Sequence, residues 1–349
     1  MKPLLLDQAP EAWDLGEAPA YRRRQIAEWI FGRRVTAFGQ MSNLPAALRH
    51  DLAARYDLEP LALARRQGSA DTTRKYLWAL RAGDFVESVL IPANPGIDGD
   101  RAGRWTLCVS SQVGCAYGCK FCASGLDGWK RHLTPGEIIG QVLAAEADSG
   151  VRVDNLVFMG MGEPLANYAQ LMTALDRLNA PSPSGLGIGA RHVTISTSGL
   201  APQIRRLADD PRQFRLAISL HGATDPVRER IMPINRRFPL AELLAACEAY
   251  QRRKRKMITL EYILIDGIND ELTEAHTLVR HARRLHAKVN LIPYNTVEGL
   301  EWRRPPRERI RAFAEVLQRA GVTATVRLEK GHDIDAACGQ LRLKEKAVA

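Results

Sequence analysis

Residues 105–122 read WTLCVSSQVGCAYGCKFC. This stretch, together with the sequence around it, indicates both the fold and the site. Its first six residues, 105–110, form a short apolar run that is typical of a buried strand. Three cysteines then follow with the spacing C-x3-C-x2-C, at Cys115, Cys119 and Cys122. Three thiols on a tight loop after a strand predict a metal centre at the carboxyl end of that strand.

The same unit recurs along the chain: a short apolar run, a loop and an amphipathic helix. Such alternation predicts an α/β fold in which right-handed β–α–β units build a parallel sheet. Periodicity alone leaves an open barrel and a doubly wound sheet as alternatives. The predicted strands are 105–110, 155–159, 192–196, 215–220, 257–265, 289–292 and 323–328, and the predicted helices are 135–148, 168–178, 202–208, 240–253, 271–285 and 307–320.

The chain before residue 105 follows another pattern. Residues 1–85 are expected to be mainly helical, with an amphipathic helix over 20–31 and a second helix that opens at Asn43-Leu44-Pro45. Alternating residues at 75–80 and 85–91, separated by Gly83-Asp84, predict a β-hairpin. The glycines and proline of residues 93–104 indicate a loop.

Composition limits the possible classes of protein. The 349 residues are 46% apolar and 25% charged, as in a globular protein, and they contain no apolar run long enough to cross a bilayer. The first residues are too short an apolar stretch for a signal peptide, so we expect a cytoplasmic protein and no membrane partner. Forty-nine Lys and Arg against 39 Asp and Glu give a net charge of +10. This excess indicates a polyanionic partner, commonly nucleic acid, although simple solvation is the alternative.

The cysteine count leaves two kinds of metal site open. Four of the six cysteines lie within fifteen residues, which is unlike a secreted disulfide framework and fits a reducing compartment. Three thiolates can hold three corners of an iron–sulfur cubane and leave one iron open. A structural zinc ion would need a fourth ligand, which Cys108, His132 or Cys338 could supply.

Polar residues follow the predicted parallel strands at their carboxyl ends. Besides the cysteines they are Gly160–Pro164, Ser196–Gly199, Ser219–His221 and Pro293–Asn295. Because barrel active sites are built at these ends, we expect the loops to meet in one site.

Several motifs resemble those of a known family. C-x3-C-x2-C with an aromatic residue before the last cysteine is similar to the radical S-adenosylmethionine (SAM) superfamily. More specifically, four segments resemble the RlmN/Cfr family of RNA adenine methyltransferases: Thr106–Cys115, Met159–Pro164, Ser219–His221 and Asp333–Leu341.

The resemblance implies a fold and a division of the chain. The expected fold is an open, partial parallel β/α barrel of the radical SAM type with a small N-terminal helical domain. Residues 1–85 would form the RNA-binding accessory domain with its hairpin, and 86–104 a connecting strand and loop. Residues 105–330 would form the barrel, and 331–349 a C-terminal segment.

It also implies the cofactors. Cys115, Cys119 and Cys122 would hold one 4Fe–4S cluster, and two SAM molecules would be consumed per turnover. Gly162 and Glu163 match the site of the SAM amino group, since a carboxylate there can accept hydrogen bonds from an ammonium. The other positions that match the SAM site are Ser196, Ser219, Leu220, His221 and Asn295. Taken alone, His221 would more often be a buried core histidine.

Three further residues match the family's reacting groups. Cys338 would carry a methyl group as S-methylcysteine, from which a carbon radical forms and adds to adenine. Cys108 would then attack the sulfur of Cys338, form a transient disulfide and release the product. Glu87 would remove the proton from the adenine carbon. Without the resemblance, Cys108 and Cys338 could be buried apolar residues, and Glu87 could lie on the solvated face of a strand.

The implied substrate is an adenosine in 23S rRNA, in tRNA or in both, flipped out of its stack to reach the barrel. C2 is the expected target carbon and C8, as in the Cfr branch, the alternative. We also expect a flavodoxin-like electron donor and a monomeric enzyme. The rival hypotheses are a different radical SAM reaction, which would not need Cys338, and a zinc-stabilised RNA-binding protein without catalysis.

Overall fold

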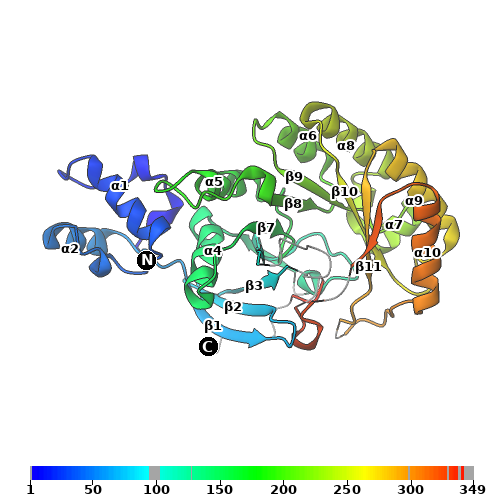
Figure 1. Cartoon of the computed structure of the whole chain (residues 1–349), viewed down its shortest axis with the longest axis horizontal. Coiled ribbons are helices and arrows are strands. Elements are labelled where there is room, and N and C mark those ends of the chain that lie inside the picture. Colours follow the sequence, from blue (N-terminus) through cyan, green and yellow to red (C-terminus); the bar gives the residue numbers. More distant parts are fainter. Residues whose placement is uncertain are drawn as a thin grey trace.

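Ten strands form one sheet in the order β1-β2-β3-β4-β7-β8-β9-β10-β11-β12 (Figure 1). The computed structural model describes residues 2–93, 103–126, 128–297, 299–327, 330–336 and 339–341, with the backbone alone at residue 332. The strand bounds are β1 Leu61–Gly68, β2 Arg74–Leu80, β3 Phe85–Pro92, β4 Trp105–Cys108, β7 Asn155–Phe158, β8 Val193–Thr197, β9 Arg215–Ser219, β10 Thr259–Leu264, β11 Lys288–Pro293 and β12 Ala324–Val326.

The sheet has an antiparallel part and a parallel part. Strands β1 to β4 pair antiparallel, and every neighbouring pair from β4 to β12 is parallel. The parallel strands follow one another in chain order, whereas a doubly wound sheet reverses its order at a switch point. Among the described strands, no pairing joins β12 back to β1, so the barrel is open. The expected open radical-SAM-type α/β barrel is therefore confirmed.

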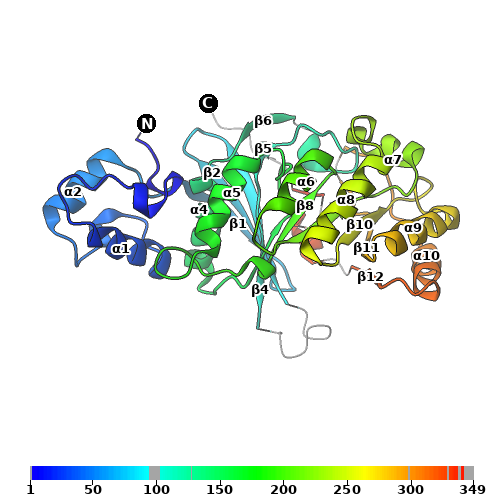
Figure 2. The same ribbon diagram turned by 90° about the horizontal axis from the view of Figure 1, so that it is seen from above.

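Helices lie on the outer side of the curved sheet, and the views in Figures 1 and 2 agree on this. Between them they cross from each parallel strand to the next, as right-handed β–α–β units require. The helix bounds are α4 Pro135–Ser149, α5 Tyr168–Asn179, α6 Ala201–Asp209, α7 Asp225–Ile231, α8 Leu240–Lys254, α9 Leu272–Arg284 and α10 Arg307–Arg319.

The expectation that residues 1–85 are mainly helical is wrong for residues 61–68, whereas the predicted hairpin at 75–80 and 85–91 is confirmed by β2 and β3, which pair antiparallel. Strand β1 occupies Leu61–Gly68 and forms the edge of the sheet, and most of its side chains are exposed. An edge strand that buries neither face shows no apolar alternation, which removes the signal that identifies a strand. Strand β12 is also shorter than the predicted 323–328, of which residue 328 lies outside the described residues. Most of the predicted loop 93–104 lies outside them as well.

A short hairpin that the sequence analysis did not predict brackets the cysteines. Its strands are β5, Gln112–Gly114, and β6, Trp129–His132, and they form a separate two-stranded sheet. Both strands are short and one is polar, so neither gives a periodic signal. The hairpin fixes both ends of the segment that carries Cys115, Cys119 and Cys122.

The N-terminal region packs against helix α4 (Figure 2). It contains α1, Tyr21–Ala27, which runs on into a π-helical turn at Glu28–Gly32, and α2, Ala46–Arg55. Asp7 Oδ1 accepts a hydrogen bond of 2.9 Å from the first-turn amide of Gly136 in α4. Arg34 forms an ion pair of 2.5 Å with Glu146 of the same helix. The domain boundaries at residues 85, 104 and 330 stay a prediction.

None of the described helices is both long enough and apolar enough to span a bilayer.

Replacing Arg34 tests the docking of the N-terminal region. The side chains of Arg34 and Glu146 are only 10% and 3% exposed, so Arg34→Met would leave a buried carboxylate without its main partner. We expect a loss of about 3 kcal/mol in the free energy of unfolding, measured by urea denaturation. Arg55→Met, at the exposed pair with Asp14, is the control and should cost less than about 1 kcal/mol. Equal effects of the two substitutions would contradict this account.

Candidate active site

One cavity opens where the loops after the parallel strands meet. The strands end at similar heights, so residues far apart in the chain line the same space. Of the residues expected to bind the metal or SAM, those lining it are Cys115, Cys119, Cys122, Gly162, Glu163, Ser196, Ser219 and His221.

A second cavity adjoins the first and shares Met159 and Ile292 with it. Cys108 and Asn295 line this second cavity. Asn295 thus lies apart from the other residues expected to bind SAM. Leu220 is fully buried and belongs to the lining of neither cavity.

The cysteine loop is held by backbone hydrogen bonds. The amide of Cys115 donates to the carbonyl of Gly128 at 3.0 Å, and the amide of Cys122 donates to the carbonyl of Cys119 at 3.0 Å. Burial raises the pKa of Cys115 to about 12 and that of Cys119 well above its ordinary value, and the neighbouring thiols add to both shifts. Cys115 and Cys119 would bind a metal as thiolates, so metal binding would displace their protons.

This donor set fits a cluster better than a single ion. Within the part of the chain that the structure describes, no three His, Cys, Asp or Glu side chains are grouped to hold one metal ion. A cubane binds each thiolate through a different iron, so its three ligands need not converge on one point. The described cysteines, at 108–122 and 247, form no disulfide with one another.

Glu163 is buried and ties two of the loops together. Its Oε1 accepts from the amide of Leu165 at 3.0 Å, and its Oε2 accepts from the amide of Ser198 at 2.6 Å. Burial raises the pKa of Glu163, and these hydrogen bonds oppose the shift. Gly162 precedes it with φ +95°, and a Cβ there would lie 2.5 Å from Cβ of Gln112. Only glycine lets the backbone run this close to its neighbour.

His221 is a neutral imidazole in the cavity wall. Its Nδ1 accepts a hydrogen bond of 3.0 Å from the amide of Ile263, which leaves the proton on Nε2. Burial, followed by the charge of Arg228, lowers the pKa of His221 to about 3. Phe121 of the cysteine loop packs edge-on against the ring at 4.7 Å. His221 can therefore donate one hydrogen bond into the cavity without carrying charge.

Arg228 of α7 is a fully buried arginine that supports the same loops. Its guanidinium donates to the carbonyls of Leu220 at 3.1 Å and Ser198 at 2.5 Å, and to Oδ1 of Asn235 at 2.8 Å. Burial lowers the pKa of Arg228 to about 10, and the nearby Cys119 opposes that shift. The cation thus lies beneath two loops of the cavity and close to one of the three thiols.

Glu87 is buried on β3, where the sequence allowed a solvated position. Its carboxylate forms an ion pair of 2.9 Å with Lys75 of the neighbouring strand β2. In the strand register Lys75 pairs with Val89, and Val89 pairs with Cys108. Paired residues share a face of the sheet, as do alternate residues of one strand, so Glu87 and Cys108 lie on the same inner face.

The C-terminal segment crosses the two cavities. Residues 337 and 338, and so Cys338, lie outside the described residues, which end at Ala336 and resume at Gly339. Gly339 lines the first cavity, and its carbonyl accepts from the amide of Ala123 at 2.8 Å. Ala336 and Leu341 line the second cavity together with Cys108.

Three residues of the site were missed in the sequence. Glu261 lines the first cavity from β10, with Asn290 donating to its Oε2 at 2.8 Å, and burial raises its pKa. A lone carboxylate inside the apolar run 257–265 was the signal for it. Gln112 and Arg228 gave no such signal, because a polar residue in a loop or short helix is usually solvated.

Comparisons with known proteins agree with this geometry. Residues 109–279 match the family model described as the radical SAM superfamily, and residues 12–58 match the ribosomal RNA large subunit methyltransferase N-terminal domain. A probable dual-specificity RNA methyltransferase RlmN of Akkermansia muciniphila is 57% identical over 93% of this chain and 90% of its own length. A protein of the same name from Geobacillus kaustophilus is 44% identical over 98% of this chain and 92% of its own length.

A solved structure extends the likeness to three dimensions. The crystal structure of a radical SAM methyltransferase from Sphaerobacter thermophilus is 42% identical, covers 98% of this chain and 100% of its own, and gives a TM-score of 0.92. The family suggested by the sequence motifs is confirmed. The chain belongs to the RlmN family of radical SAM RNA methyltransferases.

Proposed function

We propose that this chain methylates C2 of an adenosine in 23S rRNA and in tRNA through a methylated Cys338. The observation that carries the proposal is the path of the C-terminal segment. Gly339 is hydrogen-bonded to the cysteine loop, while Ala336 and Leu341 border the cavity of Cys108. Cys338 lies between these residues in the chain. This path supports a role for the Cys338 thiol in the reaction, because its described neighbours in the chain line both the cavity of the three cysteines and the cavity of Cys108.

Cys115, Cys119 and Cys122 would hold the 4Fe–4S cluster. When bound, the cluster would supply one electron to SAM, and the two SAM molecules of each turnover would provide the methyl group and the 5′-deoxyadenosyl radical that abstracts hydrogen from it. The carboxylate of Glu163 would accept from the SAM ammonium beside Gly162. Ser196, Ser219 and the Nε2–H of His221 would bind the polar groups of the nucleoside. Leu220 would act through its backbone, and Asn295 from the adjoining cavity.

Cys338 would carry the methyl group because C2 of adenine is electron-poor and is not a nucleophile toward SAM. Once the sulfur-bound carbon has joined the ring, the radical adduct would have to give up one electron, which the oxidised cluster would accept, and the C2 proton before aromaticity returns. Glu87 is the base proposed for this step. The ammonium of Lys75, 2.9 Å from Glu87 Oε1, holds the carboxylate in place on the inner face of the sheet.

Cys108 would release the product. Its thiolate attacks the sulfur of Cys338, the carbon–sulfur bond breaks, and its electron pair goes to the departing carbon, which takes up a proton. A transient disulfide between Cys108 and Cys338 remains and needs two electrons to be reduced. The position of Cys108 beside Ala336 and Leu341 supports this role.

The partners follow from the activity. The relatives are named dual-specificity RNA methyltransferases, which supports rRNA and tRNA as the two substrates. A flavodoxin-like protein would deliver electrons, and the enzyme would act as a monomer. Ribosomal and transfer RNA are cytoplasmic, so we propose the same location for the enzyme.

Cys338→Ala is the direct test of the proposal. Reconstituted protein, SAM and a reductant are incubated with unmodified rRNA or tRNA, and the nucleosides are analysed by mass spectrometry. The unaltered protein should give 2-methyladenosine, and the variant none, because the methyl group has no sulfur to join. SAM cleavage to 5′-deoxyadenosine should persist in the variant. Methylation by Cys338→Ala would contradict the mechanism, and 8-methyladenosine would identify the Cfr-type reaction.

Cys108→Ala should trap the adduct. Without the attacking thiol the carbon–sulfur bond cannot break, so RNA should stay covalently bound to the protein. Denaturing gel electrophoresis with labelled RNA would show a slowly migrating band that nuclease removes. The double variant with Cys338→Ala is the control and should give no band. If Cys108→Ala turns over without forming an adduct, another group releases the product.

Metal analysis distinguishes the cluster from zinc. Protein prepared without oxygen should be brown and bind about four irons, since a cubane contains four. Cys119→Ala should lose most of this iron because one corner loses its ligand. Cys247→Ala is the matched control, since Cys247 is buried in α8 and lines neither cavity. A colourless zinc-containing protein would refute the enzyme proposal.

A further inference from the structure

A large aromatic side chain stands exposed beside the cysteine loop. Trp129 of β6 is 47% exposed, although tryptophan is usually well covered. In the hairpin it pairs with Gly114, the residue before Cys115. The backbones are so close that a Cβ on Gly114 would lie 1.9 Å from the carbonyl oxygen of Gly128. The backbone that carries Trp129 is therefore fixed beside the first residues of the cysteine loop.

A bulge in the hairpin turns Trp129 toward His132. Arg131 pairs with Val113 and Trp129 with Gly114, so Lys130 is an extra residue in β6. Residues three apart in a regular strand face opposite sides, and one extra residue restores them to the same side. The rings of Trp129 and His132 meet edge to face at 5.4 Å. Lys130 and Arg131 point the other way, and both reach Asp84.

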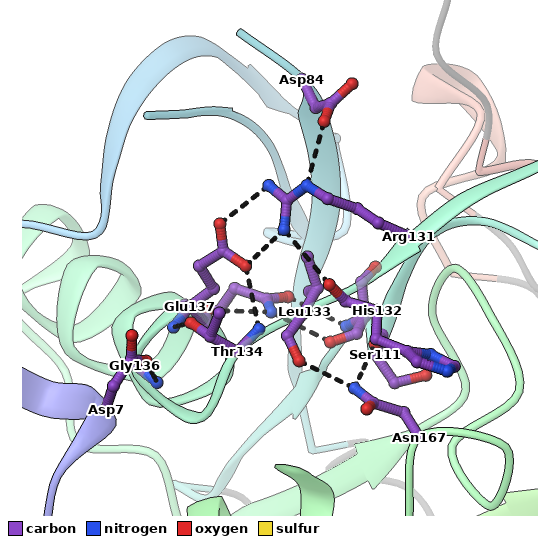
Figure 3. A network of polar contacts seen from close by, with 12 residues as sticks. Asp7, Asp84, Ser111, Arg131, His132, Leu133, Thr134, Gly136, Glu137 and Asn167 are labelled. Carbon is purple, nitrogen blue, oxygen red and sulfur yellow. Dashed lines mark hydrogen bonds and ion pairs between the residues drawn. The ribbon is translucent and has the colours of Figure 1, made fainter. Parts of the chain in front are cut away.

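Arg131 braces the hairpin against the body of the protein. Figure 3 shows its guanidinium between Glu137 of α4 and Asp84 of the β2–β3 turn. Its two nitrogens donate to Glu137 at 2.8 and 2.9 Å, a bidentate arrangement that fixes orientation as well as distance. Glu137 also accepts from the amide of Thr134, where α4 begins. The strand that carries Trp129 is thus held to the rest of the protein by Asp84 and Glu137, through the side chains of Lys130 and Arg131.

A second chain of contacts joins Trp129 to the cavity. Nδ1 of His132 accepts from Nε2 of Gln112 at 2.9 Å, because Oε1 of Gln112 is already the acceptor for the amide of Glu163 at 2.7 Å. Burial lowers the pKa of His132, which keeps the ring neutral and suited to this hydrogen bond. Trp129, His132, Gln112 and Glu163 therefore form an unbroken path from the surface to the cavity wall.

We propose that Trp129 is a stacking platform for an unpaired base of the RNA, next to the adenosine that enters the cavity. The inference rests on the proposed function and adds a recognition residue to it. An adenosine can reach the cavity only when it leaves its stack, which exposes the face of a neighbouring base. An indole face gains more from such a base than from water.

The surroundings favour RNA over a protein partner. Lys120 in the cysteine loop and Arg237 beside it are exposed. Burial raises the pKa of Tyr117 in the same loop to about 12, and the charge of Arg237 opposes that shift, which places Arg237 near the loop. Trp129 pairs with Gly114, the residue before the loop that these cations border. Cations and an exposed aromatic ring on neighbouring segments suit single-stranded RNA, which binds through its phosphates and bases.

Two substitutions that keep an apolar side chain test the platform. The probe is a fluorescein-labelled single-stranded oligoadenylate of about twelve nucleotides, and fluorescence anisotropy gives its Kd for the cluster-loaded protein. Trp129→Phe keeps a ring face and should bind within about threefold of the unaltered protein. Trp129→Leu lacks the face and should bind roughly tenfold more weakly, within the range for losing one stacked base. The dependence of Kd on salt should stay the same, since no cation is removed.

Controls separate this inference from the proposed function. Met257→Ala removes another exposed apolar side chain, just before β10 at the amino end of the parallel strands, and should leave Kd unchanged. Iron content equal to that of the unaltered protein shows that the cysteine loop is intact. Equal affinity of the Leu and Phe variants would overturn the platform, even if the unaltered protein methylates RNA. Slower reduction by flavodoxin with unchanged RNA binding would overturn it too, in favour of an electron-donor contact. Absence of methylation by the unaltered protein would instead reject the proposed function.

Discussion

Burial of ionisable groups around three thiols is the constraint on which the candidate site depends. Desolvation raises the pKa values of Cys115 and Cys119 and of the nearby carboxyls Glu163 and Glu261. Each charged form therefore needs a partner inside the protein. Glu163 accepts hydrogen bonds from two backbone amides, and Glu261 accepts one from Asn290. For the thiolates, a bound metal would be the partner. The loops of the cavity wall therefore supply backbone amides, those of Leu165 and Ser198, as donors to the buried carboxylate.

Arg228 shows how a single buried cation serves this arrangement. Its three hydrogen bonds go to two carbonyls and an amide oxygen, which remove none of its charge. A thiolate-bound cluster is anionic, so a cation near Cys119 offsets part of that charge in a region of low dielectric. The same guanidinium connects the loops after β8 and β9. Position and charge compensation thus come from one residue.

The sequence predicted the parallel barrel because most residues of strands β4 to β11 are buried or half-buried and each helix has an apolar side. The order of strands could not come from periodicity; it came from the family motifs and was confirmed by the sheet. Strand β1 and the hairpin of β5 and β6 escaped prediction because their side chains do not alternate between water and core. The strand-end loops were predicted to meet, and five of the seven expected SAM-binding residues line one cavity. Leu220 and Asn295 lie elsewhere because a motif gives the order of residues and not the direction in which each side chain points.

The antiparallel strands before the barrel hold the C-terminal segment in place. The turn between β1 and β2 holds that segment, since Ser69 donates to Asp333 at 2.5 Å and the amide of Gly331 donates to Asp71 at 3.0 Å. Lys75 of β2 donates to the carbonyl of Asp335 at 3.2 Å while it pairs with Glu87.

At its other end, the segment is held by the cysteine loop through Ala123 and Ser124. Contacts with the antiparallel strands thus hold residues 331–335, and contacts with the cysteine loop hold Gly339 and Leu341. The proposed base and the proposed methyl carrier therefore depend on the same small group of contacts, although they lie about 250 residues apart in the chain.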